Sequence, residues 1–270
     1  MSEESVEPEF PESHWEELAA AMRAGGPEAV AAFVRGFDDL GQRTRLWSFA
    51  GGGFANREWE GKDLDQIAAV YQAGIADDLE LEARWREQDA ERADQLLDQA
   101  NILSYNLAAS LAECWPGDTL PRASHHFELG LQAAEDCLRW REQLQKGPFP
   151  FSIAWWAKGM HQLSLGHRQG AVESFEQAID YGRRFACEQL GREDVGVDEA
   201  FGIAIGEGYL GLARHLIESD AGRAGSGRAQ FERACEGFRT MARIEEQRAD
   251  AEFGLAQLEH VWARLVEARA

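Results

Sequence analysis

The feature that most constrains this chain is a helical spacing of apolar residues, which runs from Leu64 almost to the last residue. Apolar side chains recur every three or four positions, the period that places them on one face of an α-helix. No run of alternating β-branched residues competes with this pattern, and all seven prolines lie at or before Pro150. The pattern predicts an all-α chain. The first stripe consists of Leu64, Ile67, Tyr71, Ile75 and Leu79.

Turn signals and composition divide the chain into three parts. Residues 1–12 are acidic and have little to bury, so we expect a disordered tail there. Residues 13–99 form an N-terminal helical region, and residues 100–270 hold helical repeats. Within the N-terminal region, "AGGP" at 24–27 is expected to stop one helix and start the next. The stretch 49–61, which contains the three consecutive glycines Gly51–Gly53, is predicted to be a loop, because glycine has the largest backbone entropy to lose.

One segment, residues 152–182, carries a recognisable repeat pattern. Trp155 and Gly159 stand four residues apart, and Ala171 and Phe175 follow with the same spacing. Small residues at Gly159 and Ala171 would let two antiparallel helices cross closely. These residues and spacings resemble the tetratricopeptide (TPR) repeat, whose pattern is W-x2-L-G-x2-Y followed by A-x3-F.

Weaker copies of the pattern flank this segment, and the resemblance extends over residues 100–268. The best copy departs from the family at Lys158 and Gln162, which stand in the Leu and Tyr positions. The resemblance implies antiparallel helix pairs stacked as a right-handed solenoid, ending in a capping helix. It also implies a groove lined by the first helix of each pair. The groove residues would be Tyr105, Trp156, Met160, Leu163, Leu212 and His215, with Trp155 packed between the helix pairs.

A second glycine motif lies at Gly206, Gly208 and Gly211, which match the G-x-G-x-x-G fingerprint of dinucleotide-binding enzymes. That fingerprint needs a strand before it and a helix start at the glycines. Here Gly211 occupies the position that Gly159 has in the neighbouring copy, inside a helix. We therefore predict that these glycines serve helix packing, and we expect no cofactor.

The net charge of −21 excludes whole classes of partner on electrostatic grounds. Such a charge repels nucleic acid and anionic membranes, so we expect neither as a partner. The four cysteines are far apart, and the acidic N-terminus has no secretory pattern. These observations predict a cytoplasmic protein whose partner is a neutral or basic protein or peptide, with homo-oligomerisation as a possibility.

No motif for catalysis or metal binding occurs: there is no G-x-S-x-G, no H-E-x-x-H, and no P-loop. The acid-rich run at 77–95 alternates with arginines and is interpreted as solvated helix faces. We predict a non-enzymatic binding scaffold of the TPR type, without catalytic or metal-binding residues. The alternative is a small-ligand sensor or enzyme with a pocket between the N-terminal helices and the repeats. Its lining would be Trp47, Trp59, His125 and His126, of which one histidine is packed and the other exposed.

Overall fold

The computed structural model describes residues 10–223 and 225–267, and this part of the chain contains helices and turns but no β-strand. The prediction of an all-α chain is therefore confirmed. The chain divides into two compact units, residues 1–111 and 112–270, and each is described by itself. The division predicted at residue 100 falls inside a helix of the first unit. Of the predicted disordered tail, residues 1–9 lie outside the described part.

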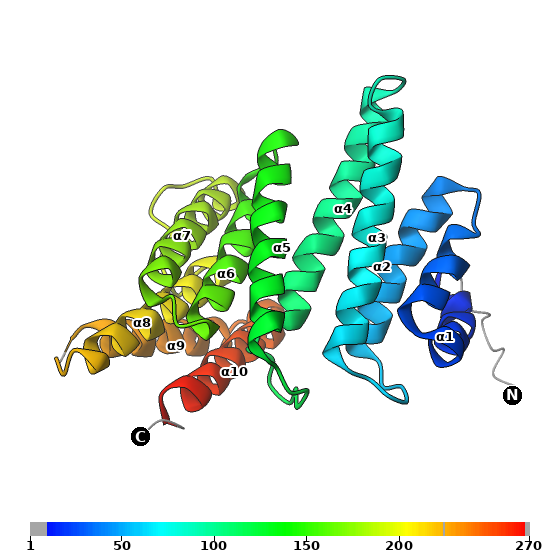
Figure 1. The fold of residues 1–270 in the computed structure, drawn as a ribbon. Coiled ribbons are helices and arrows are strands. Elements are labelled where there is room, and N and C mark those ends of the chain that lie inside the picture. Colours follow the sequence, from blue (N-terminus) through cyan, green and yellow to red (C-terminus); the bar gives the residue numbers. More distant parts are fainter. Residues whose placement is uncertain (1–9, 224, 268–270) are drawn as a thin grey trace, which may run out of the picture. The chain divides into compact units, whose positions relative to one another are not determined.

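The described residues of the first unit, 10–111, form a short 3-10 helix and four α-helices. Helices α3 and α4 form a long antiparallel hairpin, drawn in cyan to green in Figure 1, joined by the short turn at 86–89. Asp63 caps the start of α3, where its carboxylate accepts the backbone N–H of Gln66 at 2.8 Å. The elements of this unit are η1 Glu12–His14, α1 Trp15–Arg35, α2 Leu40–Asn56, α3 Leu64–Trp85 and α4 Ala90–Leu111.

Helix α1 is interrupted where the sequence predicts it. Gly25 and Gly26 leave helical geometry, and Gly26 has a φ of 65°, a conformation that glycine adopts without a steric cost. Pro27 follows in the first turn of the resumed helix. The predicted stop and restart at these residues is confirmed.

The triple glycine at 51–53 is helical, and the predicted loop is wrong for residues 49–56, while residues 57–61 are non-helical as predicted. The three glycines lie within α2 because two of them allow close packing inside the unit. A β-carbon on Gly51 would lie 2.3 Å from the ring of Tyr71, and one on Gly53 would lie 2.7 Å from the ring of Trp15. Tertiary packing thus outweighs the weak helix propensity of glycine.

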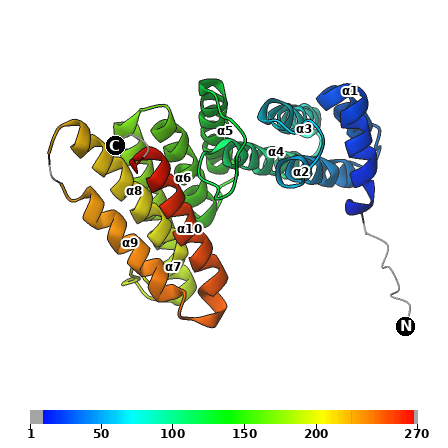
Figure 2. The same cartoon turned by 90° about the horizontal axis from the view of Figure 1, so that it is seen from below.

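The second unit continues with antiparallel helices. Neighbours along the chain pack together: α6 on α7, and α8 on α9. Helix α10 lies alongside both α8 and α9, as Figure 2 shows. Its elements are α5 Ser124–Gln143, α6 Pro148–Ser164, α7 Arg168–Leu190, α8 Phe201–Asp220, α9 Gly227–Met241, η2 Glu245–Gln247 and α10 Arg248–Leu265.

The G-x-G-x-x-G motif lies in the middle of α8, as predicted. A β-carbon on Gly211 would lie 2.5 Å from the backbone nitrogen of Phe231 and 2.8 Å from the carbonyl oxygen of Gly227, both in α9. Gly159 has the same use in α6, where a β-carbon would lie 2.5 Å from the ring of Phe175. The glycines allow helices to cross closely. None of the described helices combines the length and apolar character needed to cross a membrane.

Candidate functional site

The predicted groove residues lie mostly in the interior. Trp156, Met160, Leu163 and Leu212 are at most 7% exposed, so these four do not line an open groove. Two members of the set are half-buried. These are Tyr105, which belongs to the first unit, and His215, which belongs to the second and stacks on Trp262 with ring centroids 4.8 Å apart.

The expected roles of Trp155 and Trp156 are reversed. Trp156 is the buried ring, packed edge-on against Trp115 at 5.9 Å and Tyr209 at 6.0 Å between ring centroids. Trp155 is half-buried, and the ammonium of Lys158 lies 5.2 Å from the centre of its ring. Helical periodicity predicts that adjacent residues face different directions, but it does not say which of the two faces inward.

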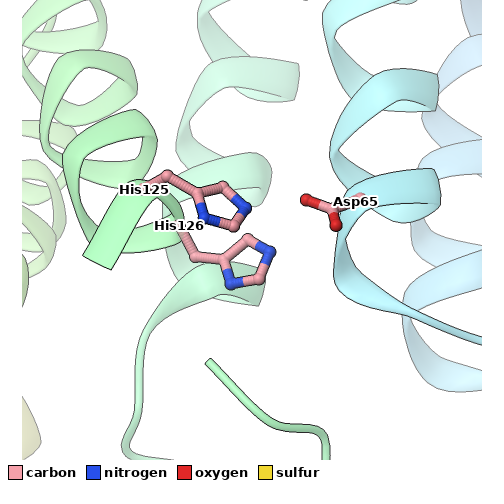
Figure 3. Close-up of side chains that lie close together, drawn as sticks. All are labelled: Asp65, His125 and His126. Carbon is pink, nitrogen blue, oxygen red and sulfur yellow. The ribbon is translucent and has the colours of Figure 1, made fainter. Parts of the chain in front are cut away.

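The two adjacent histidines at the start of α5 behave as predicted, one packed and one exposed. Figure 3 shows the rings of His125 and His126 close together, with centroids 3.9 Å apart. His126 is buried, and its Nδ1 accepts the backbone N–H of Ala123 at 3.0 Å, while His125 is exposed. Trp47 and Trp59, the other expected lining residues, belong to the first unit. The indole N–H of Trp59 donates to the carbonyl oxygen of Phe54 at 2.9 Å.

The candidate site lies in the first unit, around a buried carboxylate on α3. Asp77 is 1% exposed and accepts hydrogen bonds from two neighbouring helices. Arg35 Nε of α1 donates at 3.2 Å, and Trp47 Nε1 of α2 donates at 2.9 Å. Arg43 of α2 binds both carboxylate oxygens, with its Nε at 2.6 Å from one of them. Such a bidentate, charge-assisted arrangement fixes the carboxylate firmly.

These contacts keep Asp77 ionised. Burial alone would raise its pKa, but the hydrogen bonds from Arg43 and Trp47 and the positive charge of Arg43 outweigh burial. The pKa of Asp77 therefore lies below its ordinary value. A negative charge is held inside the unit by two guanidinium groups and one indole N–H.

Asp78, the next residue, has the opposite character. It is completely buried, and within the described part of the chain neither of its carboxyl oxygens has a hydrogen-bond partner. Burial, together with the negative charge of Asp77, raises the pKa of Asp78 from 3.8 to about 8, against a smaller opposing effect of Arg43. Two adjacent carboxyl groups thus differ in protonation at neutral pH. A neutral acid beside an ionised one is the arrangement that acid–base catalysis uses.

A cavity of about 490 Å³ adjoins this pair through Arg43, which lines the cavity and binds Asp77. Helices α2 to α4 and the segments before α2 and after α3 contribute its walls. A second cavity of about 530 Å³ shares Leu40 and Arg92 with it. The residues lining the first cavity are Phe37, Asp38, Leu40, Arg43, Leu81, Arg84, Trp85, Gln88 and Arg92.

Sequence reasoning missed this carboxylate pair. The run at 77–95 was expected to be solvated throughout, which is wrong for Asp77 and Asp78. The signal was present: Asp78 follows Tyr71 by seven residues and precedes the buried Leu81 by three, so it stands in an apolar position of the stripe. Ile75 and Leu79, expected in that stripe, are only half-buried.

Comparison with known proteins gives partial matches to proteins named formamidopyrimidine-DNA glycosylase, and no protein-family model matches the chain. The chain is 32% identical over 142 residues to the "Formamidopyrimidine-DNA glycosylase" of Xanthomonas euvesicatoria pv. vesicatoria, covering 44% of this chain and 49% of that protein. It is 33% identical over 115 residues to the protein of the same name from Xanthomonas axonopodis pv. citri, covering 35% and 42%. A Xanthomonas campestris pv. campestris protein of that name is 30% identical over 138 residues, covering 43% and 50%. The chain spans about half the length of the curated relatives it matches.

These matches correct three predictions made from the sequence. The expectation of a non-enzymatic binding scaffold is overturned, because the matched proteins are named as glycosylases, which are enzymes. The exclusion of nucleic acid is overturned by the same names, which specify DNA. The expectation of a neutral or basic protein or peptide as the partner is overturned with it, because the matched names specify DNA.

Proposed function

We propose that this chain is an enzyme that acts on bases in DNA by cleaving the bond between base and sugar. The observation that carries the proposal is the partial match to proteins named formamidopyrimidine-DNA glycosylase, at 30–33% identity. The protonated carboxyl group of Asp78 in the first unit supports it, because a positioned acid that protonates the leaving group speeds cleavage of the bond.

In this proposal Asp78 holds the proton that the reaction needs. With its pKa at about 8, Asp78 is neutral at pH 7. It is completely buried and lines neither cavity, so in this proposal DNA binding opens the surrounding helices before Asp78 protonates the departing base. A water oxygen then bonds to the sugar carbon, and the proton that this water loses restores Asp78. Asp77 is a positioning residue, since its fixed negative charge helps to keep the proton on Asp78.

A DNA-binding role requires a local positive surface on this acidic chain. Repulsion between DNA phosphates and a net charge of −21 must be overcome where the two meet. The cavity beside Asp77 offers Arg92 for this contact, because its other two arginines, Arg43 and Arg84, are paired with Asp77 and Glu80. The contact between Arg43 and Asp77, which links this cavity to the carboxyl pair, supports the first unit as the part that meets DNA.

The test is release of a damaged base. The purified chain is incubated with duplex DNA that carries one formamidopyrimidine residue, and free base is measured by mass spectrometry. The proposal predicts release that requires the folded chain and does not occur from an undamaged duplex. Absence of release at enzyme in excess over DNA, with a known glycosylase active on the same duplex, contradicts it.

We also propose that the helix pairs of residues 112–270 stack as TPR-type repeats. Two crossings support this, because Gly159 contacts Phe175 between α6 and α7, and Gly211 contacts Phe231 between α8 and α9. An experimental structure in which one rotation relates the two pairs would support the stacking, and unrelated crossings would contradict it. The cytoplasmic location expected from the separated cysteines is likewise a proposal, tested by cell fractionation.

A further inference from the structure

The 490 Å³ cavity of the first unit differs in charge from the rest of the chain. Acidic residues outnumber lysine and arginine by 48 to 27 overall, whereas Arg43, Arg84 and Arg92 face a single acidic residue, Asp38, in the lining. The remaining lining includes two aromatic rings, those of Phe37 and Trp85. Guanidinium groups next to aromatic rings bind ligands that combine a phosphate with a flat base.

The three arginines are not equally available. Arg43 is committed to Asp77, and Arg84 pairs with Glu80 at an exposed position. Arg92 has no ion-pair partner within the described residues; its guanidinium lies over the ring of Trp85, 4.1 Å from the ring centre. A guanidinium stacked in this way keeps N–H donors at its edge for an anion. Arg92 is therefore the group best placed to receive a phosphate.

We infer that this cavity binds one nucleotide of a DNA strand, with the phosphate on Arg92 and the base against Trp85 and Phe37. The inference deepens the proposed function and rests on it for the choice of DNA as the source of the phosphate. The adjoining 530 Å³ cavity shares Arg92 and is also lined by Asp89 and Glu91. These carboxylates weaken the hold on a phosphate at Arg92 and repel a second phosphate. One phosphate is therefore held here.

Binding is measured by fluorescence anisotropy with a labelled, undamaged single-stranded oligonucleotide. Arg92→Gln should weaken binding about tenfold or more, equivalent to about 1.4 kcal/mol. Arg92→Lys should lose most of this affinity too, because lysine lacks the planar fork that stacks on Trp85. The matched control is Arg228→Gln, which removes an exposed arginine paired with Glu232 in the other unit and should leave affinity unchanged. Equal affinities for Arg92→Gln and Arg228→Gln, with both variants folded, overturn the inference.

Competition with small ligands tests the phosphate contact and the base contact separately. Deoxyadenosine monophosphate should displace the oligonucleotide at a lower concentration than inorganic phosphate does, because only the nucleotide reaches the aromatic wall. Equal competition by both overturns the base contact, and no competition by the mononucleotide overturns the site.

The inference and the proposed function fail in different ways. If Arg92→Gln weakens binding but the chain releases no base, the nucleotide site stands and the glycosylase proposal falls. If base is released and Arg92→Gln binds as the unsubstituted chain does, the glycosylase proposal stands and this site falls.

Discussion

At the scale of single residues, the buried Asp78 lowers the free energy of unfolding near neutral pH. Its pKa is about 8 in the folded chain and about 3.8 when the residue is exposed to water. The unfolded chain loses this proton first as the pH rises, so the free energy of unfolding falls between these two values. The slope is about 1.4 kcal/mol per pH unit for one fully titrating group. The contribution of Asp78 to the free energy of unfolding is therefore greatest below pH 3.8 and smallest above about pH 8.

Asp78→Asn should remove this dependence and raise stability at neutral and alkaline pH. The amide has nearly the same shape and stays uncharged, so at about pH 4 the variant should match the unsubstituted chain. At about pH 8 it should be more stable by about 1 kcal/mol or more. Urea unfolding at the two pH values measures the difference, with Asp180→Asn, an exposed ion-paired position, as control. A loss of stability of the same size at both pH values contradicts the buried neutral acid.

Asp77→Asn should act in the opposite direction. It leaves the largely buried Arg43 and the exposed Arg35 without their shared carboxylate, so the unit should lose about 1–3 kcal/mol at pH 7. Thermal melts of both variants side by side give the check. If Asp77→Asn and Asp78→Asn shift the melting temperature in the same direction, the two carboxyl groups do not differ as described.

At the scale of helices, close glycine contacts decide how α8 meets α9. Gly211→Ala should destabilise by about 1–3 kcal/mol, because the added methyl would meet backbone atoms of Phe231 and Gly227 that cannot move alone. The matched control is Gly52→Ala in α2, where no atom lies within 4 Å of the added carbon. That change should stabilise by about 0.5–1 kcal/mol through helix propensity. Urea unfolding of both variants measures the contrast, and equal effects of the same sign contradict the close crossing.

The helices also show which features could be predicted from the sequence. Helical periodicity predicted the all-α chain, and the glycine spacing predicted a close crossing at Gly211, because both depend on local geometry. It failed at Gly51 and Trp156, where the outcome depends on which residues of distant helices lie opposite. It also failed at Asp77, because a buried carboxylate depends on Arg35 and Arg43 from other helices. Tertiary partners of this kind leave no local pattern.

At the scale of the whole molecule, charge sets the conditions under which DNA can bind. The net charge of −21 opposes every phosphate except those held by a local group of arginines. With one phosphate held, the logarithm of the affinity for single-stranded DNA should fall with that of salt concentration with a slope of about −0.7. Anisotropy titrations across a salt series measure the slope. A slope near zero contradicts contact with phosphate, and a much steeper one means a broad basic surface that the first unit does not have.

In the proposed function, a proton held by Asp78 drives cleavage of the base–sugar bond in DNA. The most direct measurement is base release in a single turnover, with enzyme in excess over formamidopyrimidine-containing duplex, for the unsubstituted chain, Asp78→Asn and Asp180→Asn. The account predicts release by the unsubstituted chain and Asp180→Asn, and a rate about 10²–10⁴-fold lower for Asp78→Asn at unchanged DNA affinity. Equal rates for the unsubstituted chain and Asp78→Asn, or no release by any of the three, would contradict it.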